Sequence, residues 1–546
     1  MINILIITTY IFLLSYVIRT IKNVLYHLFL WQVKEYRWDR MLAHLKTPIG
    51  KKWIAGTFSI IKSVLFFTLL ITYPMLLANP LYNPSNIFHN IYGISLVLFW
   101  LIWLIETLLS IKGLIQKRWL MPKFTSKIIF ILAVVLGFQF IFFFRGKYTS
   151  QLFWGIIMDR LLGVIVVFVV LISNIPLLIL KKVIINIAKK KISKLKDLIV
   201  IGITGSYGKT STKEFLAAIL SEKFKVVKTP GFNNTDIGIA NCILKELKPE
   251  HQVFVVEMGA YKIGEIKAIC DIVKPKIGII TGINQQHLEL FRSIENTQKA
   301  KFELIESLPK DGIAIFNGNN KYCLEMAKWT NTKSLNIFIL KTSTDVKDIK
   351  VFPDHIEFNL IDKNKSFLLK INLLGKQAIE NVLAAIYAAN SLGMTWEEIK
   401  VGISKIVAPA KTMQLVGEKN GVKLIDDTFN ANPDGVLAAV DYMKIFKGKK
   451  ILVLTPLIEL GVEAEKIHVS LGEEITKICD LILLTNFNYS KSFITGAKKV
   501  SSEAKIQIVN TSLGVKLIRD NLDKDGVVVF EGKEAGRILH QLTNDN

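Results

Sequence analysis

The sequence predicts a multi-span helical membrane region followed by a doubly wound α/β domain and a smaller α/β domain. Three observations predict this fold class. Long apolar runs fill residues 1–196, short β-rich runs alternate with helical segments after residue 197, and a glycine-rich loop follows the first short run. We therefore expect domains at 1–196, 197–408 and 409–546.

The membrane region is predicted from five apolar runs that approach the length of a spanning helix, roughly 17 to 20 residues. These runs are Ile2–Ile18, Trp53–Leu77, Ile91–Ile111, Ile128–Phe144 and Leu161–Leu180. The first also resembles a signal peptide, but it lacks a preceding basic segment and a small-residue cleavage site. So many apolar runs in succession are not typical of buried core helices, and we expect about five spans.

Charge locates the membrane faces and excludes one class of partner. The chain has a net charge of +24. Residues 1–196 hold 24 Lys and Arg against 4 Asp and Glu, so the excess lies beside the apolar runs and we expect no nucleic-acid partner. Segments 19–52, 112–127 and 181–196 are basic, and they alternate with segments 78–90 and 145–160, which are poor in basic residues.

That alternation predicts an orientation. Basic loops stay on the cytoplasmic side, so the N-terminus would lie outside and everything after Lys181 in the cytoplasm. We expect a multi-pass protein of the plasma membrane, with residues 189–196 contacting anionic membrane lipids. Lys62 and Glu106 fall inside predicted spans, where ionisable groups are candidates for function, although both are near enough to a span end to reach the interface.

The α/β part begins with alternating strands and helices. The expected strands are Leu198–Thr204, Gln252–Glu257, Ile277–Thr281 and Gly312–Phe316, and the expected helices are Lys213–Glu222, Ile237–Leu247 and Ile263–Val273. Their order is typical of βαβ units and a doubly wound parallel sheet.

A phosphate-binding loop is predicted directly after the first strand. Gly205-Ser206-Tyr207-Gly208-Lys209-Thr210-Ser211 precedes a helical run, so backbone N–H groups and the helix dipole would face an anion. Lys209 would reach the β- and γ-phosphates, and the Thr210 hydroxyl would bind Mg²⁺. The strict P-loop pattern has a glycine where Ile203 stands, and a chance Gly-Lys-Thr turn is the alternative.

Further polar residues follow the next strands. Glu257 ends one strand and His287 follows another, and the carboxyl ends of parallel strands are where such sheets bind ligands. A carboxylate and an imidazole there would hold Mg²⁺ beside the phosphates. The alternative for His287 is a structural loop histidine.

With these residues the chain resembles the Mur ligase family, and most of all its MurF-type members, over about residues 197–546. The matching stretches are Thr204–Glu214, Asn233-Asn234, Glu257–Ala260, Asn284 with His287–Glu289, Lys299–Lys301, Asp426–Pro433 and Glu459–Gly461. The resemblance implies an ATP- and Mg²⁺-dependent ligase of peptidoglycan synthesis. A carboxylate of a cell-wall precursor would become an acyl phosphate, which the amine of an amino acid or dipeptide would attack.

The resemblance also implies roles for single residues. Nucleotide-binding roles fall on Gly205, Ser206, Gly208, Lys209, Thr210, Ser211, Asn317, Asn381, Lys411 and Asp427. Metal-binding roles fall on Thr210, Glu257 and His287, substrate-binding roles on Asn233 and Asn234, and catalytic roles on Lys209, His287 and Lys301, the last as a carbamylated lysine.

Several departures from the family pattern leave alternatives open. Gln377 and Ala378 replace a His and an Asn, Lys411 replaces an Arg, and Glu531-Gly532-Lys533-Glu534 replaces Lys-Gly-Ser-Arg, which puts the amine substrate in doubt. The family's UDP-binding domain is replaced by apolar runs, which favours a lipid-linked acceptor over a UDP-linked one. The alternative functions are an ATP-driven transporter or flippase, and a non-catalytic membrane scaffold with a decayed ligase domain.

Overall fold

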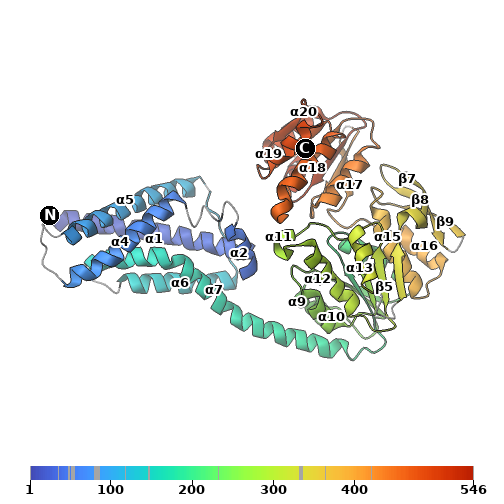
Figure 1. Ribbon diagram of the computed structural model, residues 1–546, viewed down its shortest axis with the longest axis horizontal. Coiled ribbons are helices and arrows are strands. Elements are labelled where there is room, and N and C mark those ends of the chain that lie inside the picture. The colour runs from blue at the N-terminus through green and yellow to red at the C-terminus, as the bar shows by residue number, and fades with distance from the viewer. Residues whose placement is uncertain are drawn as a thin grey trace. The chain divides into compact units, whose positions relative to one another are not determined.

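The structure, a computed structural model, consists of two compact units, Met1–Lys182 and Val183–Asn546. It describes residues 2–34, 36–46, 50, 56–78, 87–116, 118–144, 148–231, 233–330, 336–362, 365–419 and 421–544. The first unit is helical and the second contains all the strands of the described residues (Figure 1). Helix α7, Tyr148–Ile192, runs from one unit into the other.

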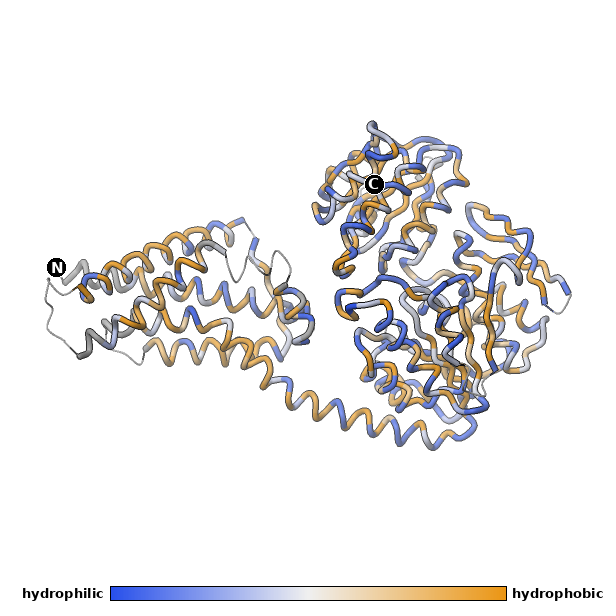
Figure 2. The backbone as a smooth tube through the Cα atoms, viewed as in Figure 1, coloured by the Kyte–Doolittle hydropathy of each residue, from blue (hydrophilic) through white to orange (hydrophobic). Residues whose placement is uncertain are grey.

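The first unit is a bundle of long apolar helices. These are α1 (Ile2–Val33), α4 (Thr57–Ala78), α5 (Ile87–Ile115), α6 (Ser126–Phe144) and the first part of α7, with the short α2 (Trp38–Lys46) beside them. Hydrophobic residues dominate these helices along their length (Figure 2). Many large apolar side chains face outward, among them Phe67, Ile71, Ile94 and Ile141.

Three described helices are long and apolar enough to cross a membrane by length and composition: Ile87–Ile115, Ser126–Phe143 and Phe153–Ile192. They correspond to the last three of the five expected spans. The second expected span corresponds to a shorter apolar helix, Phe58–Pro74, and its start at Trp53 lies outside the described residues. The first expected span lies in α1 and remains a prediction.

The side chains of Lys62 and Glu106 pair with each other and do not extend separately to a membrane–water interface. Nζ of Lys62 lies 2.7 Å from Oε1 of Glu106, and Nη2 of Arg19 lies 2.5 Å from Oε2 of the same carboxylate. Arg19 also pairs with Asp159 at 3.0 Å. Helices α1, α4, α5 and α7 each contribute to this network, so paired charges inside the bundle explain how ionisable groups are accommodated there.

The end of α7 belongs to the second unit. Ala188 and Ile192 are buried in the core beside the central sheet, and Nζ of Lys191 donates a hydrogen bond of 3.0 Å to the carbonyl oxygen of Leu244. These contacts anchor residues 183–192 to the α/β unit.

The central sheet is fully parallel, with strand order β2-β3-β1-β4-β5-β6. Its strands are β1 (Ile199–Thr204), β2 (Val226–Lys228), β3 (Val253–Glu257), β4 (Ile277–Ile280), β5 (Ile313–Asn317) and β6 (Asn336–Leu340). The helices between them are α8 (Lys209–Leu220), α9 (Asp236–Lys245), α10 (Glu265–Val273), α11 (Leu288–Phe291), α12 (Ile294–Glu306) and α13 (Lys321–Lys328). The predicted βαβ order is confirmed.

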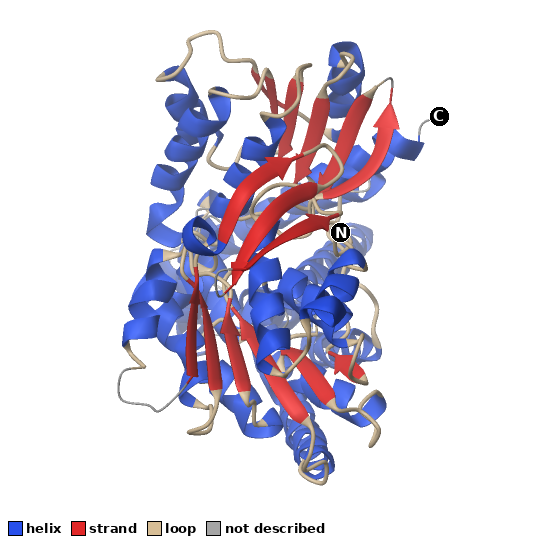
Figure 3. Cartoon of the chain, turned by 90° about the vertical axis from the view of Figure 1, so that its right-hand side faces the viewer, coloured by secondary structure: helices blue, strands red, loops and turns tan. Residues whose placement is uncertain are grey.

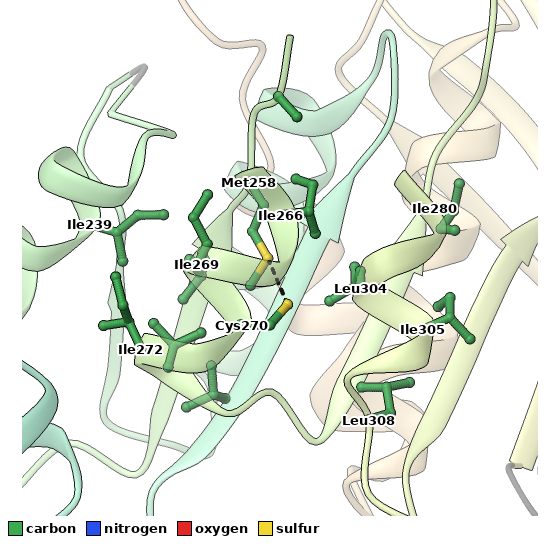
Figure 4. Close-up of a cluster of buried hydrophobic side chains, with 14 of the residues drawn as sticks. Ile239, Met258, Ile266, Ile269, Cys270, Ile272, Ile280, Leu304, Ile305 and Leu308 are labelled. Carbon is green, nitrogen blue, oxygen red and sulfur yellow. Dashed lines mark hydrogen bonds between the residues drawn. The ribbon is translucent and has the colours of Figure 1, made fainter. Parts of the chain in front are cut away.

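Apolar cores cover both faces of this sheet. On one face Met258, Ile266 and Leu304 pack together, with Sγ of Cys270 3.9 Å from Sδ of Met258 (Figure 4). Gly202 in β1 permits this packing, since a β-carbon there would lie 2.6 Å from Cδ1 of Leu304. The doubly covered sheet holds the carboxyl ends of its strands in fixed positions, and the site lies at these ends.

Two further sheets complete the unit (Figure 3). A small antiparallel sheet contains β7 (Val346–Val351), β8 (Ile356–Asp362) and β9 (Lys365–Ile371), followed by α15 (Ala378–Ser391) and α16 (Trp396–Ser404); the short α14 (Thr342–Asp345) precedes it. The C-terminal sheet has the order β10-β11-β15-β12-β13-β14. Its strands are β10 (Gln414–Lys419), β11 (Val422–Asp427), β12 (Lys450–Leu454), β13 (Leu481–Leu484), β14 (Ile506–Ile508) and β15 (Val527–Glu531), with helices α17 (Pro433–Met443), α18 (Ala464–Thr476), α19 (Ser490–Lys498), α20 (Thr511–Asn521) and α21 (Ala535–Asn544).

Candidate active site

The loop between β1 and α8 has the geometry of an anion cradle. Gly208 precedes the first helical residue with a φ of 78°, in the left-handed region. A β-carbon at Gly208 would lie 2.4 Å from Oδ1 of Asn381, so glycine is required there. The unpaired N–H groups of the first turn of α8, together with the positive end of the helix dipole, suit a phosphate at this position.

The side chains at the start of α8 are held by local hydrogen bonds. Nζ of Lys209 donates to the carbonyl oxygens of Gly205 at 2.8 Å and Ser206 at 3.1 Å. Burial lowers the pKa of Lys209, and Glu257 opposes that shift. Oγ1 of Thr210 donates to Oε2 of Glu257 at 3.0 Å. The loop thus places an ammonium group and a hydroxyl group together at one end of the sheet.

Glu257, at the end of β3, is the centre of a polar cluster. It is buried, and besides Thr210 it accepts hydrogen bonds from Nζ of Lys213 at 3.2 Å and Nδ2 of Asn234 at 3.1 Å. Lys213 also donates to the carbonyl oxygen of Gly231 at 2.6 Å. Sequence reasoning missed Lys213, although its position four residues after Lys209 on one helix could have indicated it.

The two adjacent asparagines of the expected substrate loop have different surroundings. Asn234 contacts Glu257, whereas Asn233 is exposed. Thr235, next in the chain, caps α9 by accepting a hydrogen bond from the amide of Gly238. The loop therefore leaves one asparagine free to face a ligand and fixes the other against the carboxylate.

His287 links the central domain to the C-terminal domain. Its Nδ1 lies 2.5 Å from Oε2 of Glu459, and its ring meets that of Tyr261 edge-on with centroids 4.9 Å apart. Burial lowers the pKa of His287, while the hydrogen bond and charge of Glu459 oppose the change. Its backbone has a φ of 60°, so the residue is held in a turn before α11.

Lys301 is a buried lysine on α12. The residue is 3% exposed, and its Nζ lies 5.7 Å from the ring centroid of Phe291. Burial, followed by the charge of Lys209, lowers its pKa from 10.5 to about 7. A lysine in these surroundings has a large neutral fraction at physiological pH.

Two of the predicted asparagines lie near the phosphate loop, Asn381 beside Gly208 and Asn317 beside Thr281. Nδ2 of Asn317 donates to the carbonyl oxygen of Thr281 at 2.8 Å and to Oε2 of Glu380 at 2.6 Å. Oδ1 of Asn381 accepts from the hydroxyl of Thr212 at 3.1 Å. Glu380, which sequence reasoning did not select, orients Asn317.

A cleft of about 180 Å³ connects the phosphate loop with the C-terminal domain. Its lining includes Ser206, Gly208, Lys209, Thr210, Ser211, Asn381, Phe429, Asn432, Asp427 and Glu531. Nδ2 of Asn284 bridges the two domains by donating to Asn432 and Asp434, at 2.8 Å each. Lys411, expected to contact phosphate, has an exposed side chain.

The oxygen groups near the loop fit the magnesium ion that the fold implies. Thr210 and Glu257 are in contact and supply hard oxygen donors, to which phosphate oxygens would be added. Among the residues that the structure describes, no three His, Cys, Asp or Glu side chains gather as a complete protein-only metal site. A small number of protein oxygens beside a phosphate position is typical of a magnesium ion that protein and nucleotide bind jointly.

Two family models match this chain. The Mur ligase middle domain matches residues 203–389, and the Mur ligase, glutamate ligase domain, matches residues 413–534. The UDP-N-acetylmuramoyl-tripeptide--D-alanyl-D-alanine ligase of Escherichia coli (strain K12) is 34% identical over 278 residues, which cover 50% of this chain and 61% of that enzyme. The enzyme of the same name from Bacillus subtilis (strain 168) is 30% identical, and the match covers 63% of this chain and 75% of that enzyme.

Solved structures are also similar to this chain. MurF from Acinetobacter baumannii is 26% identical with a TM-score of 0.61, covering 66% of this chain and 80% of that one. A MurF ligase from Thermotoga maritima in complex with ADP is 25% identical with a TM-score of 0.58, covering 66% and 83%.

Proposed function

This chain belongs to the Mur ligase family, and we propose that it joins D-alanyl-D-alanine to a muramoyl tripeptide, the reaction named for its MurF relatives. It is an ATP-dependent acid–amino-acid ligase, and it uses ATP and Mg²⁺. The peptide substrates are the proposal. The observation that best supports a ligase that uses ATP is the arrangement of Lys209 and Thr210 in the cleft lining, with Glu257 bonded to Thr210.

We assign the phosphates of ATP to the loop from Gly205 to Ser211. The N–H groups of α8 would bind them, and Lys209 would exchange its two carbonyl partners for the β- and γ-phosphate oxygens. Mg²⁺, when bound, would neutralise phosphate charge, with Thr210 and Glu257 as its ligands. Lys213 keeps Glu257 in place, because it pairs with that carboxylate and with the substrate loop.

The reaction proceeds in two transfers. The acceptor carboxylate attacks the γ-phosphorus of ATP, which forms an acyl phosphate and releases ADP. The amine of the incoming dipeptide then attacks the acyl carbon, phosphate leaves, and the amine gives up a proton as the amide forms. His287, placed by Glu459, and Lys301, as a carbamate, would position the acceptor and its charge near the phosphate loop.

Turnover of ATP tests this assignment. We expect the purified chain to release ADP only when both a muramoyl tripeptide and D-alanyl-D-alanine are present. A transporter or flippase would hydrolyse ATP without the dipeptide, and a decayed scaffold would bind the nucleotide without turnover. Either result would contradict the proposal.

We also propose that the ligase is held at the membrane and acts on a lipid-linked acceptor. The supporting observation is a first unit with apolar side chains outside and paired charges inside, followed by basic residues 181–196. An enzyme and a substrate confined to one bilayer meet at a raised effective concentration. The ligase domains would then lie in the cytoplasm, where ATP is found.

The activity of a shortened chain distinguishes a lipid-linked acceptor from a UDP-linked one. It should begin at Val183, because Ala188 and Ile192 belong to the core of the α/β unit. We expect the full chain in nanodiscs to prefer the lipid-linked acceptor, and the shortened chain to bind ATP while losing that preference. Full activity of the shortened chain on the UDP-linked tripeptide would contradict the lipid-linked proposal.

A further inference from the structure

Asp427 and Glu531 place two carboxyl groups side by side in the wall of the nucleotide cleft. They end the neighbouring parallel strands β11 and β15 and lie in register with each other. Their side chains therefore leave the same face of the sheet from backbones ~5 Å apart. Both line the cleft that also contains Lys209 and Thr210.

The pair has hydrogen-bonding capacity that the described residues do not fill. Glu531 is 1% exposed, and its Oε1 has no hydrogen-bond partner in the described part of the chain. Oδ1 of Asp427 accepts from the amide of Met413 at 3.2 Å. The two adjacent carboxyl groups can share one proton, which would let one of them donate a hydrogen bond to the other. Burial agrees with that proton, because it raises the pKa of both groups, that of Asp427 to about 6.

Charge decides which part of the nucleotide this pair can face. Phosphate oxygens are acceptors and carry negative charge, so buried carboxyl groups would repel them. The loop at Gly205–Ser211 already provides donors and an ammonium group for the phosphates. The pair must therefore face an uncharged part of ATP. The ribose has two adjacent hydroxyl donors, which match two adjacent acceptors, and Phe429 and Leu373 in the same cleft suit the flat base.

A cation is the less suitable ligand. The shared proton leaves the pair with a single negative charge, and in the described residues no third His, Cys, Asp or Glu joins it as a metal site. Thr210 and Glu257, the residues that would bind magnesium, lie instead on the central domain.

The resemblance to the family places Asp427 at the ribose, and we propose that Glu531 is a second ribose-binding residue beside it, which makes the cleft selective for nucleotides that keep both ribose hydroxyls. One hydroxyl donates to Glu531 and the other to Asp427, while the shared proton holds the two carboxyl groups together. The inference rests on ATP as the nucleotide and is independent of which peptide or acceptor is joined. A failed ligation assay therefore leaves it intact, and its own failure leaves the ligase proposal intact.

Titration calorimetry on the full-length chain tests this role through binding alone. The probes are ADP, 2′-deoxy-ADP and 3′-deoxy-ADP with Mg²⁺, and the proteins are wild type, Glu531→Leu, Glu531→Gln and the control Glu418→Leu, whose exposed carboxylate lies on β10 in the same domain. We expect wild type to bind ADP roughly 10- to 100-fold more tightly than either deoxy form, because each missing hydroxyl leaves a buried acceptor unpaired.

The variants should differ in their affinity for ADP and in their discrimination between the nucleotides. Glu531→Leu should bind ADP roughly 10- to 100-fold more weakly and lose discrimination at one hydroxyl. Glu531→Gln should stay within about threefold of wild type, since its amide can donate to Asp427 permanently while its carbonyl accepts from the ribose. The control should behave as wild type does.

Four results would overturn the proposal. In two of them, Glu531→Leu discriminates among the nucleotides as wild type does, or weakens the binding of all three nucleotides by one common factor. In the third, chelating Mg²⁺ abolishes the difference in nucleotide binding between the variants, which would assign the pair to a cation. In the fourth, a folded Glu531→Gln protein, whose side chain preserves size and shape, loses ADP binding by more than about threefold, which would contradict the proposal even if the Leu variant does not fold.

Discussion

Lys301 allows a direct test of the site, because burial strongly favours the neutral form of its side chain. Desolvation and the nearby charge of Lys209 lower its pKa from 10.5 to about 7. That change corresponds to ~5 kcal/mol in favour of the neutral amine. At about pH 7.5, roughly three quarters of Lys301 would be neutral, against about one part in a thousand for an ordinary lysine.

A neutral amine can react with carbon dioxide. The nitrogen forms a bond to carbon and releases a proton, so the side chain becomes a carbamate with a negative charge. We expect Lys301→Ala to lower kcat by about 10²- to 10³-fold, the usual loss when one preorganised charged group is removed. Formate or acetate should restore part of the rate, because a small carboxylate can occupy the vacated space.

The assay combines initial rates with ¹³C NMR of protein equilibrated with ¹³C-labelled bicarbonate. Wild type should show a carbamate signal that Lys301→Ala lacks, and its rate should fall in buffer stripped of carbon dioxide. Lys299→Ala is the matched control, because Lys299 lies on the same helix with an exposed side chain paired to Glu295. An unimpaired Lys301→Ala enzyme, together with no carbamate signal in wild type, would refute the reasoning.

Three further predictions concern the nucleotide cleft and the fold. Lys209→Ala should lower the rate of ATP turnover by at least about 10²-fold, because no other residue of the loop carries a positive charge. A near-normal rate would exclude this loop as the phosphate-binding site. Asp427→Asn should raise the melting temperature at neutral pH but not near pH 4. Because the pKa of Asp427 is raised, the folded protein holds this proton more tightly than the unfolded chain does. The free energy of unfolding therefore falls by ~1–3 kcal/mol as the pH rises from about 4 to about 6, and an asparagine, which does not ionise, removes that loss. Equal melting temperatures of the two proteins at neutral pH would contradict this. Gly402→Ala should destabilise the α/β unit by ~1–3 kcal/mol, because its β-carbon would lie 2.5 Å from the Cα of Ile219. Gly417→Ala, with its nearest atom at 4.0 Å, is the control, and similar denaturation midpoints for the two variants would refute the packing argument.

The strands of the central domain could be predicted closely from local patterns. Ile199–Thr204 and Val253–Glu257 differ from the predicted runs by one residue at their starts, because buried parallel strands are continuous apolar runs with clear ends. The helix after the phosphate loop was predicted to begin at Lys213 but begins at Lys209. Thr and Ser have low helix propensity, which hid the first turn, whereas Gly208 fixes its start.

Contacts between distant segments could not be predicted. The sequence indicated Lys62 and Glu106 but not Arg19 or Asp159, because their pairing depends on how four helices pack. Glu531 follows the apolar run Val527–Phe530 and could have been an exposed strand end. Only the strand order, which places β15 beside β11, brings it to Asp427.

In the site, too, local patterns could be predicted and contacts between distant segments could not. The motif spacing indicated that Lys209, Thr210 and Glu257 lie at one edge of the sheet, because strand ends of one parallel sheet meet there, and in the structure the Thr210 hydroxyl donates to Glu257. The bond from His287 to Glu459 joins two domains, so no local pattern contains it. Such contacts depend on tertiary packing, which single-sequence periodicity does not describe.

The most direct test of the central claim is a product balance on the full-length chain in nanodiscs. ATP, Mg²⁺, D-alanyl-D-alanine and a muramoyl tripeptide, in UDP-linked and in lipid-linked form, are incubated with the enzyme, and mass spectrometry follows the acceptor while ADP and phosphate are quantified. We predict that one acceptor gains the mass of the dipeptide less one water, with one ADP and one phosphate for each bond formed. ADP release without a heavier acceptor in either form would contradict the account.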